Sequence, residues 1–192
     1  MPVAVKRKEQ ILGIAGNFFR ERGYAATSMR HIARKVGVEP ASLYSHFKSK
    51  DEILQYICFR IADEFFEMQE PILNSMSNPV EKLKRLVTGH INVIIHNLEA
   101  ASVFFNEWCY LKKPELKKFI AMRERYEKGF HDVIQQGITS GDFRMTDTNF
   151  TVRLLFSVMN GVHEWYKTSG KVTPDEAGEK MSEFILEGLA IK

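Results

Sequence analysis

The 192-residue sequence has few of the features that mark secreted, membrane or metal-binding proteins. Its two cysteines, Cys58 and Cys109, form no CxxC pair, which argues against a disulfide framework or a cysteine zinc site. No apolar run approaches the roughly 20 residues that cross a bilayer. The basic residues near the N-terminus are not followed by the apolar stretch of a secretory signal. We therefore expect a cytoplasmic protein whose thiols are reduced.

Catalytic and cofactor-binding patterns are also missing. The six histidines form neither an HExxH motif nor a Cys/His cluster. The sequence shows no nucleophile paired with a base, no phosphate-binding loop and no convincing pair of carboxylates. These absences predict a protein that is not an enzyme and that uses no metal or cofactor.

The sequence shows no convincing run of alternating apolar and polar residues, and no repeat of 20–50 residues. Apolar residues recur instead at spacings of three and four, which is the period of an amphipathic helix. The apolar fraction of 44% leaves enough side chains for a core. The sequence therefore predicts an all-α protein.

Charge is distributed unevenly along the chain. Residues 1–50 carry ten Lys and Arg against three acidic residues, a net charge of +7, whereas residues 51–192 carry a net charge of −4. A basic module joined to a mildly acidic one suggests that the first meets a polyanion such as nucleic acid, although a solvated basic face is the alternative. We predict two domains with a boundary between residues 50 and 51.

Two helices and their ends can be predicted in the first forty residues. The first covers about residues 8–22 and ends at Gly23, a residue suited to the left-handed turn after a helix. The second starts after Thr27 or Ser28, because either hydroxyl can accept hydrogen bonds from the exposed amides of the first turn. Gly37 ends this helix after about two turns.

A third helix is predicted over residues 40–46, opened by a proline at its first position. Its apolar residues, Leu43 and Phe47, would face the core. Three short helices with a glycine turn between the last two describe a helix-turn-helix DNA-binding unit, while a three-helix cap with a solvated face is the alternative. Lys48 and Lys50 would lie along the phosphate backbone. The predicted outward, DNA-contacting residues of this helix are Ala41, Ser42, Tyr44, Ser45 and His46.

The rest of the chain is predicted to form further helices over about residues 49–74, from 79, 100–111, 114–141, 147–167 and from 174. The last two are more apolar than a monomer should expose, which is typical of an isologous four-helix interface. Dimerisation also follows from DNA binding, because one short helix reads few bases and two copies about 34–36 Å apart can read a palindrome.

The middle helices are rich in aromatic residues and methionine, with scattered polar groups. Apolar walls with few polar anchors suit a small amphipathic ligand, although ordinary core packing gives the same composition. A lysine group at 112, 113, 117 and 118 either attracts a ligand phosphate or forms a solvated helix face. The candidate ligand-binding residues are Trp108, Arg123, Tyr126, Asn160 and Trp165.

The segment ILGIAGNFFRERGYAATSMRHIARKVGVEPASLYSHFKSKDEIL, residues 11–54, resembles the TetR family of bacterial transcriptional regulators. The resemblance implies an all-helical homodimer of nine or so helices. The first three would bind DNA and the others would form a ligand-sensing and dimerisation domain. It also implies DNA contacts from Thr27 and Ser28 at the start of the second helix, from the outward residues of the third, and from Lys50. Arg30 and Lys48 are added from their charge and placement.

Three further segments are similar to the acyl-CoA-responsive branch of that family: FNEWCYL (105–111), RERYEKGFHDVIQQGITSGDF (123–143) and NGVHEWYKTSGKVTP (160–174). Cys109 and Gly161 depart from it, at positions where a basic residue and a tryptophan are expected. We expect a repressor released from a palindromic operator by a small apolar or acyl-CoA ligand. The alternative is a DNA-binding regulator without a sensor, which a protein partner controls or which acts architecturally.

Overall fold

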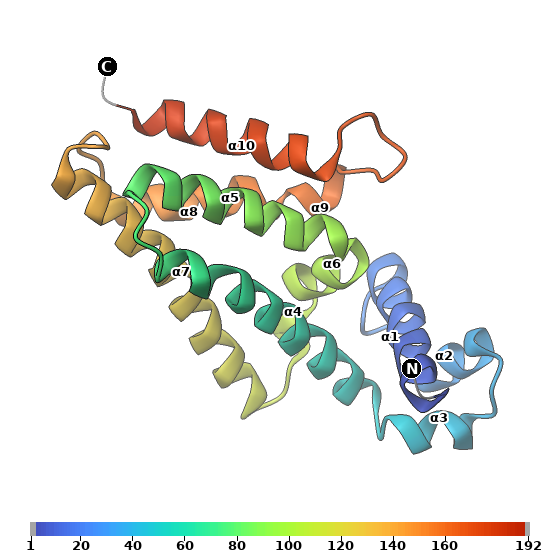
Figure 1. The fold of residues 1–192 in the computed structure, drawn as a ribbon. Coiled ribbons are helices and arrows are strands. Elements are labelled where there is room, and N and C mark those ends of the chain that lie inside the picture. Colours follow the sequence, from blue (N-terminus) through green and yellow to red (C-terminus); the bar gives the residue numbers. More distant parts are fainter. Residues whose placement is uncertain (1–2, 191–192) are drawn as a thin grey trace. The chain divides into compact units, whose positions relative to one another are not determined.

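The computed structural model describes residues 3–190, and within that range helices are joined by loops and there is no strand (Figure 1). The all-α class predicted from the sequence is confirmed. The elements are α1 (Val3–Arg22), α2 (Met29–Val36), α3 (Pro40–His46), α4 (Lys50–Leu73), α5 (Pro79–His96), α6 (Leu98–Asn106), the 3₁₀ turn η1 (Trp108–Tyr110), α7 (Glu115–Ser140), α8 (Thr148–Asn160), α9 (Val162–Trp165) and α10 (Pro174–Leu189). Within residues 3–190 no helix combines the length and apolar character that a bilayer span needs.

Contacts between residues divide the chain into two compact units. The first unit contains residues 1–61 and 98–120, and the second contains residues 62–97 and 121–192. Helices α4 and α7 each begin in the first unit and continue into the second. The boundary predicted between residues 50 and 51 separates a DNA-binding domain from a ligand-sensing and dimerisation domain. It is a division by role, and it stays a prediction.

In the first unit, α2 is defined by local signals at both ends. The hydroxyl of Ser28 accepts a hydrogen bond from the backbone N–H of His31, which is the N-cap interaction expected of a serine. At the other end Gly37 adopts φ +77°, a left-handed conformation that glycine tolerates without a steric penalty. Its N–H bonds to the carbonyls of Ala33 and Arg34 and closes the helix. Both predicted ends of this helix are confirmed.

Helix α3 follows after a short turn and begins with Pro40 at its first position. Leu43 and Phe47 are buried, so they fasten the helix to the core of the first unit as the sequence predicted. Helix α2 packs against both α1 and α3. The three helices therefore form the helix-turn-helix arrangement expected from the sequence.

Two predicted helices end earlier than expected. The segment predicted as residues 100–111 changes its hydrogen-bond pattern after Glu107. The N–H groups of Tyr110 and Leu111 bond the carbonyls three residues earlier, those of Glu107 and Trp108, and this 3₁₀ pattern gives η1. The segment predicted as 147–167 is interrupted at Gly161. There the ring of His163 bonds the backbone oxygen of Asn160, an acceptor that a continuous helix would offer to the N–H of Glu164. The Glu164 N–H bonds Gly161 instead, so α9 is a separate short turn.

In the second unit α10 lies along α5, and α5 also contacts α8 and α9 (Figure 1). Gly178 allows the close approach of α10, because a β-carbon there would lie 2.8 Å from Cγ2 of Thr88 on α5. A capping box between Thr173 and Glu176 defines the start of α10. The core of this unit contains a cluster of aromatic rings around one histidine, His90.

Candidate nucleic-acid interface

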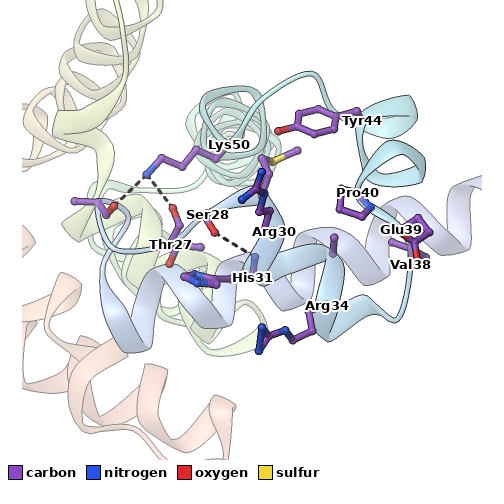
Figure 2. A pocket seen from close by; sticks show the side chains of 13 residues that line it. Thr27, Ser28, Arg30, His31, Arg34, Val38, Glu39, Pro40, Tyr44 and Lys50 are labelled. Atoms are coloured by element: carbon purple, nitrogen blue, oxygen red, sulfur yellow. Dashed lines mark hydrogen bonds between the residues drawn. The ribbon is translucent and has the colours of Figure 1, made fainter.

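Helices α2 and α3 border an open hollow of about 990 Å³ on the surface of the first unit. Figure 2 shows its lining: α2 contributes Arg30, His31 and Arg34, and α3 contributes Pro40 and Tyr44. All five of these residues are exposed. The hollow therefore presents positive and hydrogen-bonding groups from two helices on one surface.

The outward side of α3 has the composition predicted for a helix that reads DNA. Ala41, Ser42, Tyr44 and Ser45 are exposed, while His46 is half-buried. The Ser45 hydroxyl donates to the Ser42 carbonyl at 2.7 Å, which leaves its oxygen free to accept. Small residues let the helix backbone approach a groove, and the Tyr44 phenol can both donate and accept.

The start of α2 and the chain after α3 add further predicted residues to this surface. Ser28 is half-buried and lines the hollow, although its hydroxyl already caps α2. Arg30, two residues later, is exposed. Lys48 is exposed after α3, and its backbone N–H donates to the carboxylate of Glu52 at 2.6 Å. Arg30 and Lys48 are thus both open to solvent, and their contact with phosphate groups stays a prediction.

Thr27 lines the hollow, but little of its side chain is open to solvent (Figure 2). The residue is 2% exposed, and its hydroxyl lies 3.0 Å from the carbonyl oxygen of Gly23 and 3.3 Å from that of Phe18. A hydroxyl has one proton, which these carbonyls already accept. Thr27 therefore stabilises the loop between α1 and α2, and its predicted DNA contact stays a prediction.

Lys50 lines the hollow, but its ammonium group is already engaged. Its Nζ lies 2.9, 3.3 and 3.0 Å from the backbone oxygens of Tyr24, Ala25 and Thr27. An ammonium has three N–H donors, so three carbonyls use them all. The nitrogen also lies 4.3 Å from the centre of the Tyr24 ring. Lys50 thus holds a loop in this structure, which differs from the phosphate contact predicted for it.

His31 and Arg34 line the hollow although the sequence analysis did not select them as DNA-binding residues. Residues three and four apart lie on one side of a helix, so Arg30, His31 and Arg34 share a face of α2. The spacing of these three basic residues can be read from the sequence, and it was enough to predict that His31 and Arg34 lie on the same side of α2 as Arg30.

In the second unit, two of the predicted ligand-binding residues are brought together by His90. Its Nδ1 lies 3.0 Å from the Tyr126 hydroxyl and its Nε2 lies 3.1 Å from Oδ1 of Asn160. The Asn160 oxygen can only accept, so Nε2 carries the proton and Nδ1 accepts from Tyr126. Gln69 donates to the backbone oxygen of Tyr126 at 2.9 Å, so helices α4, α5, α7 and α8 meet in one polar cluster.

Burial determines the charge state of this cluster. Desolvation lowers the pKa of His90 to about 3, and the hydrogen bond to Asn160 opposes the shift only in part. Burial also raises the pKa of Tyr126 well above its ordinary value. The rings of Phe65 and Phe156 lie 4.6 and 5.5 Å from the His90 ring, centre to centre, and exclude water from it. The cluster is therefore neutral at physiological pH.

The other three predicted ligand-binding residues lie elsewhere. Trp108 belongs to the first unit, where its ring stacks on that of Phe119 at 6.0 Å. Arg123 lies 3.8 Å from the carboxylate of Glu127 on the same helix. Trp165 is 53% exposed on α9. The structure places none of these three among the hydrogen bonds of His90, and their part in ligand binding stays a prediction.

Helices α8 and α10 present an apolar surface. Phe150, Leu154 and Val158 of α8 are 59%, 51% and 43% exposed, and Phe184 of α10 is 70% exposed. These side chains line a groove of about 550 Å³ between the two helices. An exposed apolar patch with this many large side chains is typical of an interaction surface.

Comparisons with known proteins match both parts of the chain. The family model described as "Bacterial regulatory proteins, tetR family" matches residues 11–57, and the model "Tetracyclin repressor-like, C-terminal domain" matches residues 76–189. The HTH-type transcriptional repressor KstR2 of Mycolicibacterium smegmatis is 28% identical over 185 residues, which cover 95% of this chain and 90% of that protein.

Solved structures agree with these matches. The ketosteroid transcriptional regulator KstR2 of Mycobacterium tuberculosis has a TM-score of 0.92 at 28% identity, covering 97% of this chain and 96% of that one. AibR, solved in complex with isovaleryl coenzyme A and operator DNA, has a TM-score of 0.81 at 23% identity, covering 96% and 98%. At that identity the second likeness shows the fold alone.

Proposed function

Since the chain belongs to the TetR family of bacterial regulatory proteins and is a DNA-binding transcriptional regulator, we propose that it is a repressor whose homodimer is released from a palindromic operator by a small ligand. Members of this family are regulators and not enzymes, as the sequence analysis predicted. The observation that carries the proposal is the outward face of α3, which combines small and hydrogen-bonding side chains with a firmly buried opposite side.

The residues divide into two kinds of DNA contact. Ser42, Tyr44 and His46, with the small Ala41 and Ser45 beside them, would meet base edges in the major groove. A second group would bind phosphates and fix the register of the helix on the duplex. The proposed phosphate-binding residues are Ser28, Arg30 and Lys48, together with His31 and Arg34.

The surface formed by Phe150, Leu154, Val158 and Phe184 supports the homodimer. A second copy of the chain would cover this patch with its own α8 and α10, in an isologous four-helix arrangement. Such an interface removes several large apolar side chains from water, and each is worth about 1.5–3 kcal/mol when fully buried. The dimer would then hold two α3 helices about 34–36 Å apart on one face of the duplex.

A ligand with apolar and polar parts is supported by the second unit. Its core combines aromatic walls with the polar cluster of Tyr126, His90 and Asn160. The relatives support the same class, because one is named a ketosteroid regulator and the fold of AibR accommodates isovaleryl coenzyme A. The three segments that resemble the acyl-CoA-responsive branch point the same way, while Cys109 and Gly161 depart from it. We therefore propose a small apolar compound or its CoA thioester as ligand.

For release to occur, the ligand must bind the DNA-free state more tightly than the DNA-bound state. A tenfold loss of operator affinity needs a difference of about 1.4 kcal/mol between the two affinities. The same difference must appear as a tenfold weaker affinity for the ligand when operator is bound, because the coupling is reciprocal.

The proposal can be tested in two steps. Selection from a pool of random duplexes gives the preferred sequence, which should be two-fold symmetric if a dimer reads it. Fluorescence anisotropy then measures affinity for that duplex with added acyl-CoA thioesters, free CoA, fatty acids and steroid acids. A compound that weakens operator binding at least tenfold, without weakening binding to a scrambled duplex, supports the sensor.

The second candidate is a DNA-binding regulator without a small-molecule sensor. The dense packing of Phe65, Phe130 and Phe156 around His90 favours it, since a filled core leaves less room for a ligand. Operator binding that no compound of these classes changes would favour this candidate over the ligand-released repressor.

A further inference from the structure

The loop between α1 and α2, residues 23–28, is held from two sides within the first unit. On one side are Lys50 and Asp51, the first residues of α4. On the other side is the segment 108–112, which contains η1. Because Ser28 caps α2, the position of this loop determines where α2 begins. The contacts that hold the loop therefore bear on the DNA-binding face.

Asp51 is shared by both sides. One of its carboxylate oxygens accepts a hydrogen bond from the Tyr24 hydroxyl in the loop. The other oxygen, Oδ2, accepts from Nζ of Lys112 at 2.8 Å. Asp51 thus links Tyr24 of the α1–α2 loop to Lys112 of the 108–112 segment, which lies 61 positions after the aspartate in the chain.

Ring contacts and the Lys50 ammonium complete the arrangement. The Tyr110 ring lies 5.1 Å from the Tyr24 ring, centre to centre. Lys50 uses its three donors on the carbonyls of Tyr24, Ala25 and Thr27 (Figure 2 shows part of this set). The loop carbonyls lie within a small region, and a cation there offsets their mutual repulsion.

The protonation states match these contacts at neutral pH. The hydrogen bond from Lys112, followed by that from Tyr24, lowers the pKa of Asp51, so its carboxylate is charged and accepts from both. Burial and the neighbouring Asp51 raise the pKa of Tyr24, so its hydroxyl keeps the proton that it donates. The arrangement is therefore complete under the conditions in which the protein binds DNA.

We propose that Lys50 and Asp51 are positioning residues for DNA binding, and that Lys112 couples the α1–α2 loop to the 108–112 segment. In this arrangement a displacement of the 108–112 segment withdraws Lys112 and Tyr110 from the loop and loosens the start of α2. The side chains of Arg30, His31 and Arg34 on α2 then lose their fixed positions beside α3. The inference rests on DNA binding by this unit and is independent of which ligand the protein senses.

The test of coupling compares two exposed lysines. Lys112→Met removes the ion pair with Asp51, whereas Lys117→Met removes an equal charge from α7 in the same unit without touching the loop. The ion pair is largely exposed, and pairs of that kind contribute up to about 1 kcal/mol, or roughly fivefold in an equilibrium constant. We expect Lys112→Met to lower the ratio of operator to scrambled-duplex affinity about threefold, and both Lys117→Met and Lys112→Arg to leave it unchanged.

Hydrogen exchange of the free protein tests the same contact without DNA. Peptides covering residues 23–31 should exchange faster in Lys112→Met than in Lys117→Met, with equal thermal midpoints in the two variants. Equal exchange in both variants, together with equal affinity ratios, would overturn the coupling. If the wild-type protein showed no preference for any selected duplex, the proposed function would fail while the exchange result still decided on the coupling.

Lys50 is tested by the salt dependence of binding. A lysine that contacts phosphate weakens all DNA binding when it is removed and lowers the salt slope by about 0.9 per contact. For a positioning residue, Lys50→Met lowers operator affinity at least about tenfold and leaves scrambled-duplex affinity and the slope unchanged. Equal losses on both duplexes with a smaller slope would show a phosphate contact and overturn the assignment.

Discussion

The strongest quantitative prediction concerns His90, whose folded and unfolded pKa values differ widely. Burial lowers its pKa from 6.5 to about 3 in the folded chain. Between these values the unfolded chain binds a proton that the folded chain cannot bind, so the free energy of unfolding falls as pH falls. Going from pH 7 to pH 5, this one group costs about 2 kcal/mol of stability by linkage.

The variant His90→Gln removes this titration and keeps one donor and one acceptor near Tyr126 and Asn160. We expect its free energy of unfolding to fall by about 2 kcal/mol less than that of the wild type between pH 7 and pH 5. Urea unfolding at both pH values gives the difference, at one protein concentration because an oligomer's stability depends on it. His96→Gln is the matched control, since it replaces an exposed histidine on the same helix.

The control should follow the wild type at both pH values. The other groups that titrate in this range are common to the wild type and His90→Gln, so they cancel in that comparison. If His90→Gln lost as much stability as the wild type on acidification, His90 would not be the buried neutral group that its contacts with Tyr126 and Asn160 imply.

Three further changes test the packing and the interface. Phe184→Asp puts a charge into the apolar surface of α8 and α10 and should convert the proposed dimer to monomers in sedimentation velocity. The neighbouring change Glu183→Asp should leave the dimer intact. A dimer that survived Phe184→Asp would place the interface elsewhere. Gly137→Ala sets a β-carbon 2.2 Å from Cδ2 of Phe143. This overpacking should lower the free energy of unfolding by about 1–3 kcal/mol and with it the thermal midpoint. An unchanged midpoint would mean that the Phe143 ring moves freely. In Gly37→Ala the added β-carbon meets no neighbour within 4 Å, so only the backbone conformation at φ +77° opposes the change. Urea unfolding should show a free energy of unfolding lower by about 1 kcal/mol.

The helices of the fold and most of the outward residues of α3 could be predicted, because interactions between residues close in the sequence determine them. Ser28 caps α2 and Pro40 opens α3 through interactions with their own first turns. Leu43 and Phe47 are the apolar residues of a short polar segment, so their burial fixes which side of α3 faces outward. These signals lie within a few residues of the structure that they determine.

The roles of Thr27 and Lys50 could not be predicted, because their partners come together only in the folded chain. The carbonyls that Lys50 bonds lie 23 to 26 residues earlier in the sequence. In the same way, His90 finds its partners 36 and 70 residues away, so a lone histidine on an apolar stripe gave no sign of its cluster. The break at Gly161 depends on a side chain competing for a backbone acceptor, which helical periodicity does not record.

The central claim is that the outward face of α3 reads DNA sequence, and one measurement tests it most directly. Anisotropy titrations at a single salt concentration compare the wild type with the double variant Ser42→Ala, Tyr44→Ala on the selected operator and on a scrambled duplex. Base contacts are worth about 1–3 kcal/mol each, so operator affinity should fall at least about tenfold while scrambled-duplex affinity stays the same. Unchanged operator affinity in the double variant would contradict the claim.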